Sequence, residues 1–364
     1  MLPAVTRHSP DIPTSPRFGS GRLLTSVFST LERKPLNDLV LKDIFCFNLP
    51  YMALARTTQE LRDMLPNQLG LLAVTIGSMT LMPPLLRKPA AWISGQSEAS
   101  LKERLSPELL KTIGKKAKLA RLGVSFGLLF PFAAGFMAVP FMRDWLTVER
   151  SGTANFEQLI GLKQGNKNET AEDTQKSIDH YKSLFFKTLG AGFGLGAASL
   201  VGFSLASRRA GATANKLVDG LFNNFSLRGK SSGEVAGVAS TMLFWLLPPY
   251  VGWMMAARDK TERREFMIKG VNSLLWFSLF TPFFLKGKAV NKFAKLGIDT
   301  GVDKAKNTLV KGFQGSIPTY EAIQKLAPEV KEKALKVKDR YALLSWLIPV
   351  TMLGLSPQMF NIFF

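Results

Sequence analysis

Six stretches of this chain contain no charged side chain, and this feature constrains the fold more than any other. They are Met64–Leu86, Leu122–Met142, Thr188–Ser207, Val235–Ala257, Gly270–Leu285 and Tyr341–Phe364. An α-helix needs about 20 apolar residues to cross the hydrocarbon core of a membrane, and all but one of these stretches reach about that length. Buried helices of soluble proteins usually keep a polar face, which these stretches lack. The pattern predicts an all-α, polytopic membrane helix bundle.

A seventh and shorter stretch, Ile44–Ala55, is free of charge for 12 residues. That length suits a half-crossing or an interfacial helix as well as a full span. Counting it with the six charge-free stretches gives a bundle of about seven transmembrane helices.

Matching residues recur at a separation of 199 positions. Pro50 and Tyr51 correspond to Pro249 and Tyr250, and each pair ends an apolar run and precedes a group of charges. An ordered series of such matches predicts an internal duplication. With seven crossings, three in each copy and one between them, the two copies point the same way across the membrane, a parallel repeat. The alternative is that membrane helices rich in Leu, Phe, Gly and Pro resemble one another by composition alone.

The predicted organisation follows from these stretches and their connections. It comprises a disordered polar tail at 1–38, a first membrane repeat at 39–145, a polar outer loop at 146–183, a central Gly-rich transmembrane helix at 184–207, a basic cytoplasmic linker at 208–232 and a second membrane repeat at 233–364 with a long basic loop at 286–340. The composition of the tail also fits a cleaved organellar transit segment.

The chain carries a formal net charge of +20, with 47 basic residues. Lys and Arg collect on the cytoplasmic side of membrane proteins. With seven crossings, 33 of the 47 fall on one side, which predicts a cytoplasmic N-terminus in the plasma (inner) membrane, or alternatively an organellar location. The other, outer side comprises residues 56–63, 143–187 and 258–269, and the last segment fits the rule least because it holds five basic residues.

Basic amphipathic stretches flank the spans at Leu101–Arg121, Ala289–Phe313 and Val330–Arg340. Their apolar residues recur three and four positions apart, with Lys on the remaining face, so they predict helices on the membrane surface that bind anionic lipid head groups. No nucleic-acid partner is expected, because the charge is spread over loops next to spans rather than concentrated in one module.

The stretch around Thr188–Ser207 is unusually rich in glycine. The spacing of Gly190 with Gly194, and of Gly192 with Gly196, lets two membrane helices approach closely. These four residues are therefore predicted to be helix-packing positions. A nucleotide-binding glycine loop would need a preceding strand and an acidic residue about 20 positions on, and neither is evident.

Prolines interrupt or end several of the predicted spans. Each removes a backbone donor and crowds the preceding turn, so it kinks or breaks the helix. Broken helices can line a cavity in transporters, although static kinks are also common in membrane helices. The candidates for kinks and a possible cavity are Pro50, Tyr51, Pro131, Pro249, Tyr250 and Pro349.

Several chemistries are improbable for this chain. His8 and His180 are its only histidines and Cys46 its only cysteine, so no metal site, cofactor or catalytic residue is predicted. No Asp, Glu, Lys, Arg or His lies inside the six stretches, which argues against proton coupling and against an intramembrane acid/base or metallo-enzyme.

Three functions remain open. The leading one is a permease or channel-like protein for a small neutral or lipid-like solute, which predicts a polar cavity between the two units. A membrane scaffold or assembly subunit would instead be a filled bundle. A lipid-modifying enzyme would need loop residues to converge, and the candidates are Glu60, Arg62, Asp63, Glu262, Arg264 and Glu265. The alternative interpretation of these six is that they are solvated helix-capping pairs.

Overall fold

The computed structural model describes residues 20–94, 114–161, 170–209, 216–227, 240, 242–303 and 306–355. Every regular element among them is a helix and none is a strand, so the predicted all-α class is confirmed. Two of these helices, α7 (Lys115–Ser151) and α9 (Ala171–Arg209), are long and apolar enough to cross a membrane. The start of the predicted tail, most of the Leu101–Arg121 stretch, residues 210–215 and 228–232 of the linker and the last nine residues lie outside the described parts.

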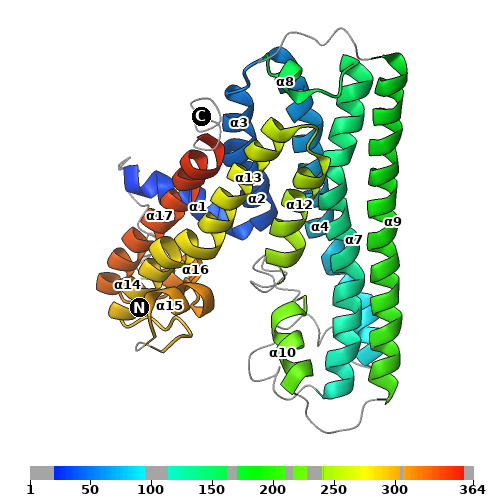
Figure 1. Cartoon of the computed structure of the whole chain (residues 1–364). Helices are drawn as coiled ribbons and strands as arrows, with labels where there is room; N and C mark the ends of the chain where they lie inside the picture. The colour runs from blue at the N-terminus through cyan, green and yellow to red at the C-terminus, as the bar shows by residue number, and fades with distance from the viewer. Residues whose placement is uncertain are drawn as a thin grey trace, which may run out of the picture.

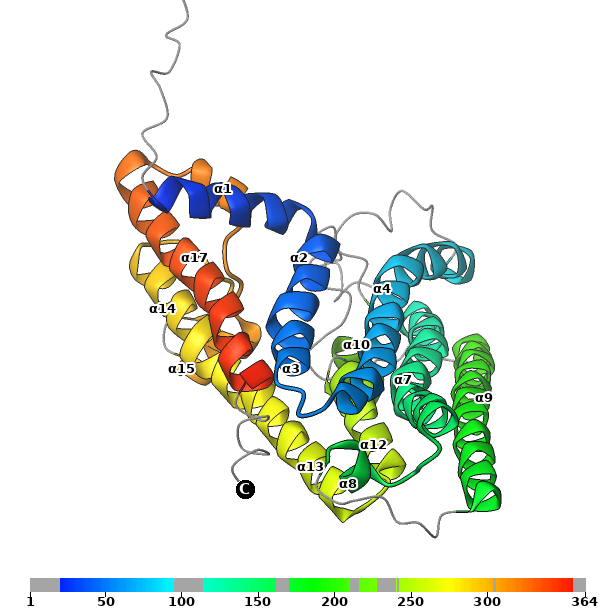
Figure 2. The ribbon, with the colours of Figure 1, turned by 90° about the horizontal axis from the view of Figure 1, so that it is seen from above.

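Three long helices form one side of the molecule. α7 lies between α4 (Thr58–Ser94) and α9 (Figure 1, Figure 2). Three shorter elements also pack against α7, namely α10 (Lys216–Phe225), the π-helical segment η2 (Met242–Leu246) and α12 (Leu247–Ala256). Apolar side chains such as Leu129 and Phe244 form the shared core of this layer.

The other side of the molecule combines both ends of the chain. Its N-terminal elements are α1 (Ser20–Arg33), α2 (Pro35–Lys42), the π-helical segment η1 (Asp43–Asn48) and α3 (Leu49–Ala53). Its C-terminal elements are α13 (Lys260–Leu275), η3 (Trp276–Gly287), α14 (Lys288–Lys295), α15 (Thr308–Gln314), α16 (Tyr320–Gln324), α17 (Pro328–Pro349) and η4 (Val350–Leu355). α1 crosses α17, and α2 lies between α17 and α4 (Figure 2).

The predicted disordered tail at 1–38 is wrong from Ser20 onward, where α1 begins. Leu24, Phe28 and Leu31 recur at helical spacing and give α1 an apolar face, and Phe28 packs near Trp346. Polar contacts fix the same helix to α17, because Lys338 lies 2.6 Å from the carboxylate of Glu32.

The predicted outer loop at 146–183 is largely helical. α7 continues to Ser151, the single turn α8 (Phe156–Leu159) follows, and α9 already begins at Ala171. These extensions are stabilised by packing, since Ile178 and Tyr181 of α9 contact a core with Phe141 and Val148 of α7.

The Gly-rich helix is not central, as the sequence predicted, but lies at the edge of the molecule against α7 (Figure 1, Figure 2). Only one of its two glycine pairs makes the close approach. Gly192 faces the backbone of Phe130, and Gly196 faces the carbonyl of Gly127, whereas no atom lies near Gly190 or Gly194. The two pairs are two residues apart, which places them on opposite faces of a helix.

A π-helical segment lies next to a proline at each of four places. η1 precedes Pro50, η2 precedes Pro248 and Pro249, η3 contains Pro282, and η4 follows Pro349. A proline cannot donate its hydrogen bond and pushes the preceding carbonyl away, which favours the wider turn. Pro131, by contrast, lies within a continuous α7.

The basic loop at 286–340 folds into short helices around a core of its own. Ala289 and Phe293 of α14 pack with Ile323 of α16 and Ala334 of α17. The predicted helix Ala289–Phe313 is therefore divided into α14 and α15. Gly297 and Gly301 lie between them with φ of 76° and 70°, a conformation that glycine adopts readily.

Candidate functional site

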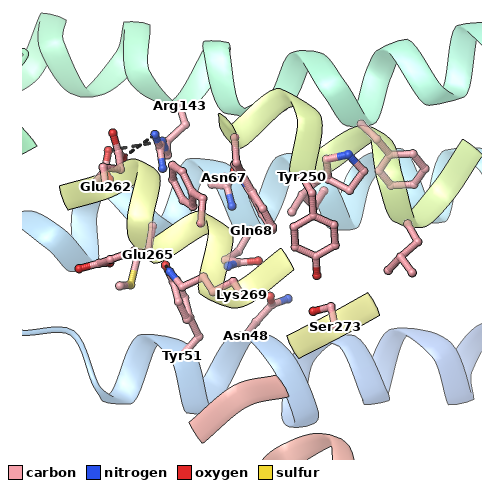
Figure 3. A pocket seen from close by; sticks show the side chains of 18 of the residues that line it. Asn48, Tyr51, Asn67, Gln68, Arg143, Tyr250, Glu262, Glu265, Lys269 and Ser273 are labelled. Carbon is pink, nitrogen blue, oxygen red and sulfur yellow. Dashed lines mark hydrogen bonds and ion pairs between the residues drawn. The ribbon is translucent and has the colours of Figure 1, made fainter. Parts of the chain in front are cut away.

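A cavity of about 210 Å³ lies between the N-terminal and C-terminal parts of the chain. Residues of α4 and α13 contribute most of the lining, and η1, α3, η2, α12, α7 and α8 contribute the rest. Its polar and aromatic lining includes Asn67, Gln68, Tyr250, Lys269 and Ser273 (Figure 3). Trp253 also lines it.

The structure brings three of the six kink and cavity candidates together. Tyr51, Pro249 and Tyr250 line the cavity, and Pro50 is buried beside it without lining it. The other two lie elsewhere: Pro131 packs against Gly196 of α9, and Pro349 ends α17. None of the four packing glycines of α9 borders the cavity.

Two arginines near one end of the cavity have the same local geometry. The backbone N–H of Arg56 donates to Glu60 at 2.6 Å, and its side-chain nitrogens donate to the same carboxylate at 3.1 and 2.7 Å. Arg258 makes the corresponding three bonds to Glu262 at 2.7, 3.1 and 2.8 Å. In each case the arginine lies just before a helix, α4 or α13, and the glutamate lies in its first turn.

Each arginine also reaches a carboxylate on the opposite helix. Arg56 lies 2.8 Å from Glu265 of α13, and Arg258 lies 2.9 Å from Asp63 of α4. Glu265 stands seven residues after Arg258, and Asp63 seven residues after Arg56. These two ion pairs, Arg56–Glu265 and Arg258–Asp63, which we call the cross-pairs, are therefore reciprocal, as in an arrangement with an approximate two-fold axis.

The short helix α8 covers this arrangement from one end (Figure 1). The ring of Phe156 lies 5.8 Å from the Arg56 guanidinium and 5.2 Å from the Arg258 guanidinium, within reach of cation–π attraction. The hydroxyl of Thr57 donates to the carbonyl of Leu159, and the carboxylate of Asp259 accepts from the N–H of Glu157. Thr57 and Asp259 also cap α4 and α13, so each repeats the role of the other.

α7 contributes a third arginine and a further carboxylate. Arg143 donates to Asp144 and, at 2.8 Å, to Glu262. The hydroxyl of Thr147 donates to Asp63 at 2.6 Å. Together with Lys269 these groups form what we call the ion-pair cluster: Arg56, Glu60, Asp63, Arg143, Asp144, Arg258, Glu262, Glu265 and Lys269.

The cluster is buried, and this corrects the solvated interpretation of the carboxylates singled out in the sequence. Glu60, Asp63 and Glu262 are 2%, 3% and 0% exposed, and Glu265 is also buried. Arg62 and Arg264, the two arginines among those six candidates, point to the surface instead. The six apolar stretches are still free of charged side chains, because these groups flank the stretches and are folded away from water.

Sequence reasoning missed Arg56, Arg143, Asp144, Arg258 and Lys269. A signal for two of them exists: Ala55-Arg56 and Ala257-Arg258 open matching segments, A-R-T-T-Q-E-L-R-D and A-R-D-K-T-E-R-R-E, which are 202 residues apart. The separation differs by three from that of the Pro-Tyr pairs, since α12 is longer than α3. A search at one constant offset misses them.

All nine cluster residues lie in the three segments that charge counting assigned to the outer side, residues 56–63, 143–187 and 258–269. The structure brings these distant segments together at one end of the helices. It also accounts for two of the five basic residues in the segment that fitted the charge rule least, because the side chains of Arg258 and Lys269 are buried with partners inside the protein.

Lys269 of α13 is buried and lines the cavity. Its ammonium group donates to the hydroxyl of Tyr51 and lies 4.0 Å from the centre of that ring. Burial lowers the pKa of Lys269 to about 8, although Glu265 and Glu60 oppose this shift.

This pKa predicts a specific pH dependence of stability. A lysine whose pKa is lower in the folded state loses its proton before the unfolded chain does, so stability rises between about pH 8 and the ordinary lysine pKa of 10.5. The slope contributed by this one group cannot exceed about 1.4 kcal/mol per pH unit. We expect Lys269→Met to remove this rise and Lys260→Met, at an exposed position of the same helix, to retain it. Denaturant unfolding between pH 7 and 10.5 measures the difference, and equal curves for the two variants would contradict the assignment.

Comparison with protein-family models, curated proteins and solved structures finds no match to this chain. Among the described residues, no group of three or more metal-ligating side chains could hold a metal ion. The site is therefore interpreted from its own geometry.

Proposed function

We propose that this chain is a membrane carrier, a permease-like protein that holds a small neutral or lipid-like solute in the cavity between the N-terminal and C-terminal parts of the chain, which we call its two halves. The observation that carries the proposal is a cavity whose end is closed by reciprocal ion pairs between equivalent positions of α4 and α13. Carriers built from structural repeats bind solute at the repeat interface and open it alternately to either side. Breaking the cross-pairs would separate the two halves at this end.

The lipid-facing surface supports placement in a membrane. α9 is long and apolar, and it exposes the large apolar side chains of Phe186, Phe193, Leu195 and Val201. Water would oppose such exposure, whereas lipid would solvate it. We propose the arrangement of about seven spans, with the N-terminus in the cytoplasm and the ion-pair cluster toward the outer side. The plasma (inner) membrane is the favoured location and an organellar membrane the alternative, with anionic lipid against the basic cytoplasmic helices.

The lining of the cavity suits a small solute with a few polar groups. Trp245, Tyr250 and Trp253 supply aromatic surface, and Gln68 and Ser273 supply hydrogen-bonding groups. Apolar walls with a few placed polar groups are typical of small-molecule sites. A scaffold, by contrast, would require no cavity between its halves.

Thiol labelling from each side of the membrane tests the proposal. Cys46 is the only cysteine, so Cys46→Ser provides a background in which Gln68→Cys reports the cavity. Arg62→Cys, at an exposed position beside the cluster, marks the outer side. We expect an impermeant maleimide to label Gln68→Cys only from the side opposite to Arg62→Cys. Labelling from neither side would indicate a filled scaffold, and labelling from the outer side would show that the cluster does not close the cavity.

A further inference from the structure

The charges of the ion-pair cluster do not balance in one of its two parts. Around Arg56, two cations face two carboxylates: Arg56 and Lys269 against Glu60 and Glu265. Around Arg258, two cations face three carboxylates, because Arg143 and Arg258 serve all of Asp63, Asp144 and Glu262. A net negative charge in a buried site is costly, and the usual remedy is a bound cation or a proton.

The hydrogen bonds show where that proton would be held. Both oxygens of Asp63 accept bonds, from Thr147 and from Arg258. Both oxygens of Glu262 accept bonds as well, from Arg143 and from Arg258.

Asp144 differs from these two carboxylates. Its Oδ1 accepts from Arg143, whereas its Oδ2 is buried and has no hydrogen-bond partner among the residues that the structure describes, and the residue is 0% exposed. A carboxylate oxygen without a donor in a dry interior is where the charged form is least favourable.

The charged and titratable groups around Asp144 come from several elements. Asp63 faces it from α4, Glu262 from α13, Arg258 from the turn before α13, and the phenol of Tyr181 from α9, while Arg143 lies beside it on α7. None of these supplies a donor to Oδ2.

We propose that Asp144 is a proton-binding site, protonated on Oδ2 in the closed state of the cluster. The proton brings the Arg143–Arg258 part of the cluster to neutrality. If the cluster opens as the carrier function requires, water reaches Asp144 and its proton leaves, so solute movement would be coupled to a proton; this last step rests on the proposed function.

Infrared spectroscopy of the purified full-length protein at pH 7 tests the site without any solute. We expect the C=O stretch of a protonated carboxyl group, a shift of that band when aspartate is labelled with ¹³C in its side-chain carboxyl, and loss of the band in Asp144→Asn. Asp173→Asn, the same change at an exposed residue of α9, should keep it. No such band in the wild type, a band that ignores the aspartate label, or a band that survives in Asp144→Asn would overturn the proposal.

A stability comparison keeps the test decisive if a variant folds poorly. Asparagine is the neutral isostere of a protonated aspartate, so Asp144→Asn should unfold at the same or higher denaturant concentration than the wild type at pH 7. Asp63→Asn, which neutralises a fully paired carboxylate, should unfold earlier. A lower midpoint for Asp144→Asn than for Asp63→Asn would overturn the proposal. Neither measurement involves transport. The protonation of Asp144 can therefore be confirmed or refuted even if the labelling experiment contradicts the carrier hypothesis.

Discussion

Arg258→Met is expected to destabilise the protein by about 3–5 kcal/mol, the cost of removing one partner from a buried ion pair. The Arg258 guanidinium is bonded to Asp63 and Glu262 and lies 3.7 Å from Asp144. Without it, three buried carboxylates would share Arg143 alone. Methionine retains much of the apolar stem of the side chain, so the loss reports the charge and its hydrogen bonds rather than the packing.

Arg264→Met is the matched control for this change. Arg264 lies on α13, the helix that Arg258 precedes, but its side chain is exposed, so its replacement should stay within about 0.5 kcal/mol of the wild type. Denaturant unfolding in detergent micelles measures both variants. Asp63→Asn combined with Arg258→Met should recover part of the loss, because it also removes an unpaired carboxylate. If Arg258→Met were as stable as Arg264→Met, the cluster would not hold the two halves together.

The helical class could be predicted from the sequence because it depends on local composition. Uninterrupted apolar stretches favour helices wherever they lie in the fold. The Pro-Tyr pairs likewise pointed to the cavity, since Tyr51 and Tyr250 both line it. The seven-span arrangement stays a prediction, because two helices are the candidate spans among the described residues.

The ion-pair cluster could be predicted only in part: Glu60, Asp63, Glu262 and Glu265 were candidates, but their burial arises only when three distant segments meet. A charged residue beside a span looks the same in sequence whether it is solvated or buried. Asp144 illustrates this, because nothing near it in the chain indicates that Arg258, the arginine before α13, lies 3.7 Å away. The amphipathic segment after Ser20 was missed for a different reason: its serines and threonines suggested disorder, although its leucines and Phe28 recur at helical spacing.

The glycines of α9 show what periodicity can and cannot determine. Their spacing separates them into two faces, Gly190 with Gly194 and Gly192 with Gly196, but the sequence gives no reason to choose between the faces. In the structure only the second pair contacts α7.

Because only one face of α9 contacts α7, a Gly→Ala substitution is expected to have opposite effects on stability on the two faces. Gly192→Ala would place a methyl group against Ala134 and 3.0 Å from the carbonyl oxygen of Phe130, so α9 must move away from α7. Overpacking of this kind costs about 1–3 kcal/mol. Gly194→Ala meets no atom within 4 Å and gains the helix propensity of alanine, worth up to about 1 kcal/mol. Unfolding midpoints of the two variants should therefore shift in opposite directions.

Gly196→Ala and Gly190→Ala extend the comparison by one helical turn in each direction. A Cβ on residue 196 would lie 2.8 Å from the carbonyl oxygen of Gly127, a backbone atom that cannot rotate aside, whereas one on residue 190 would meet nothing. We expect Gly196→Ala to behave like Gly192→Ala, and Gly190→Ala like Gly194→Ala. Equal stability of all four variants would mean that α9 does not pack closely against α7. A loss confined to Gly190→Ala and Gly194→Ala would place a further partner, such as a second copy of the chain, on the outward face of α9.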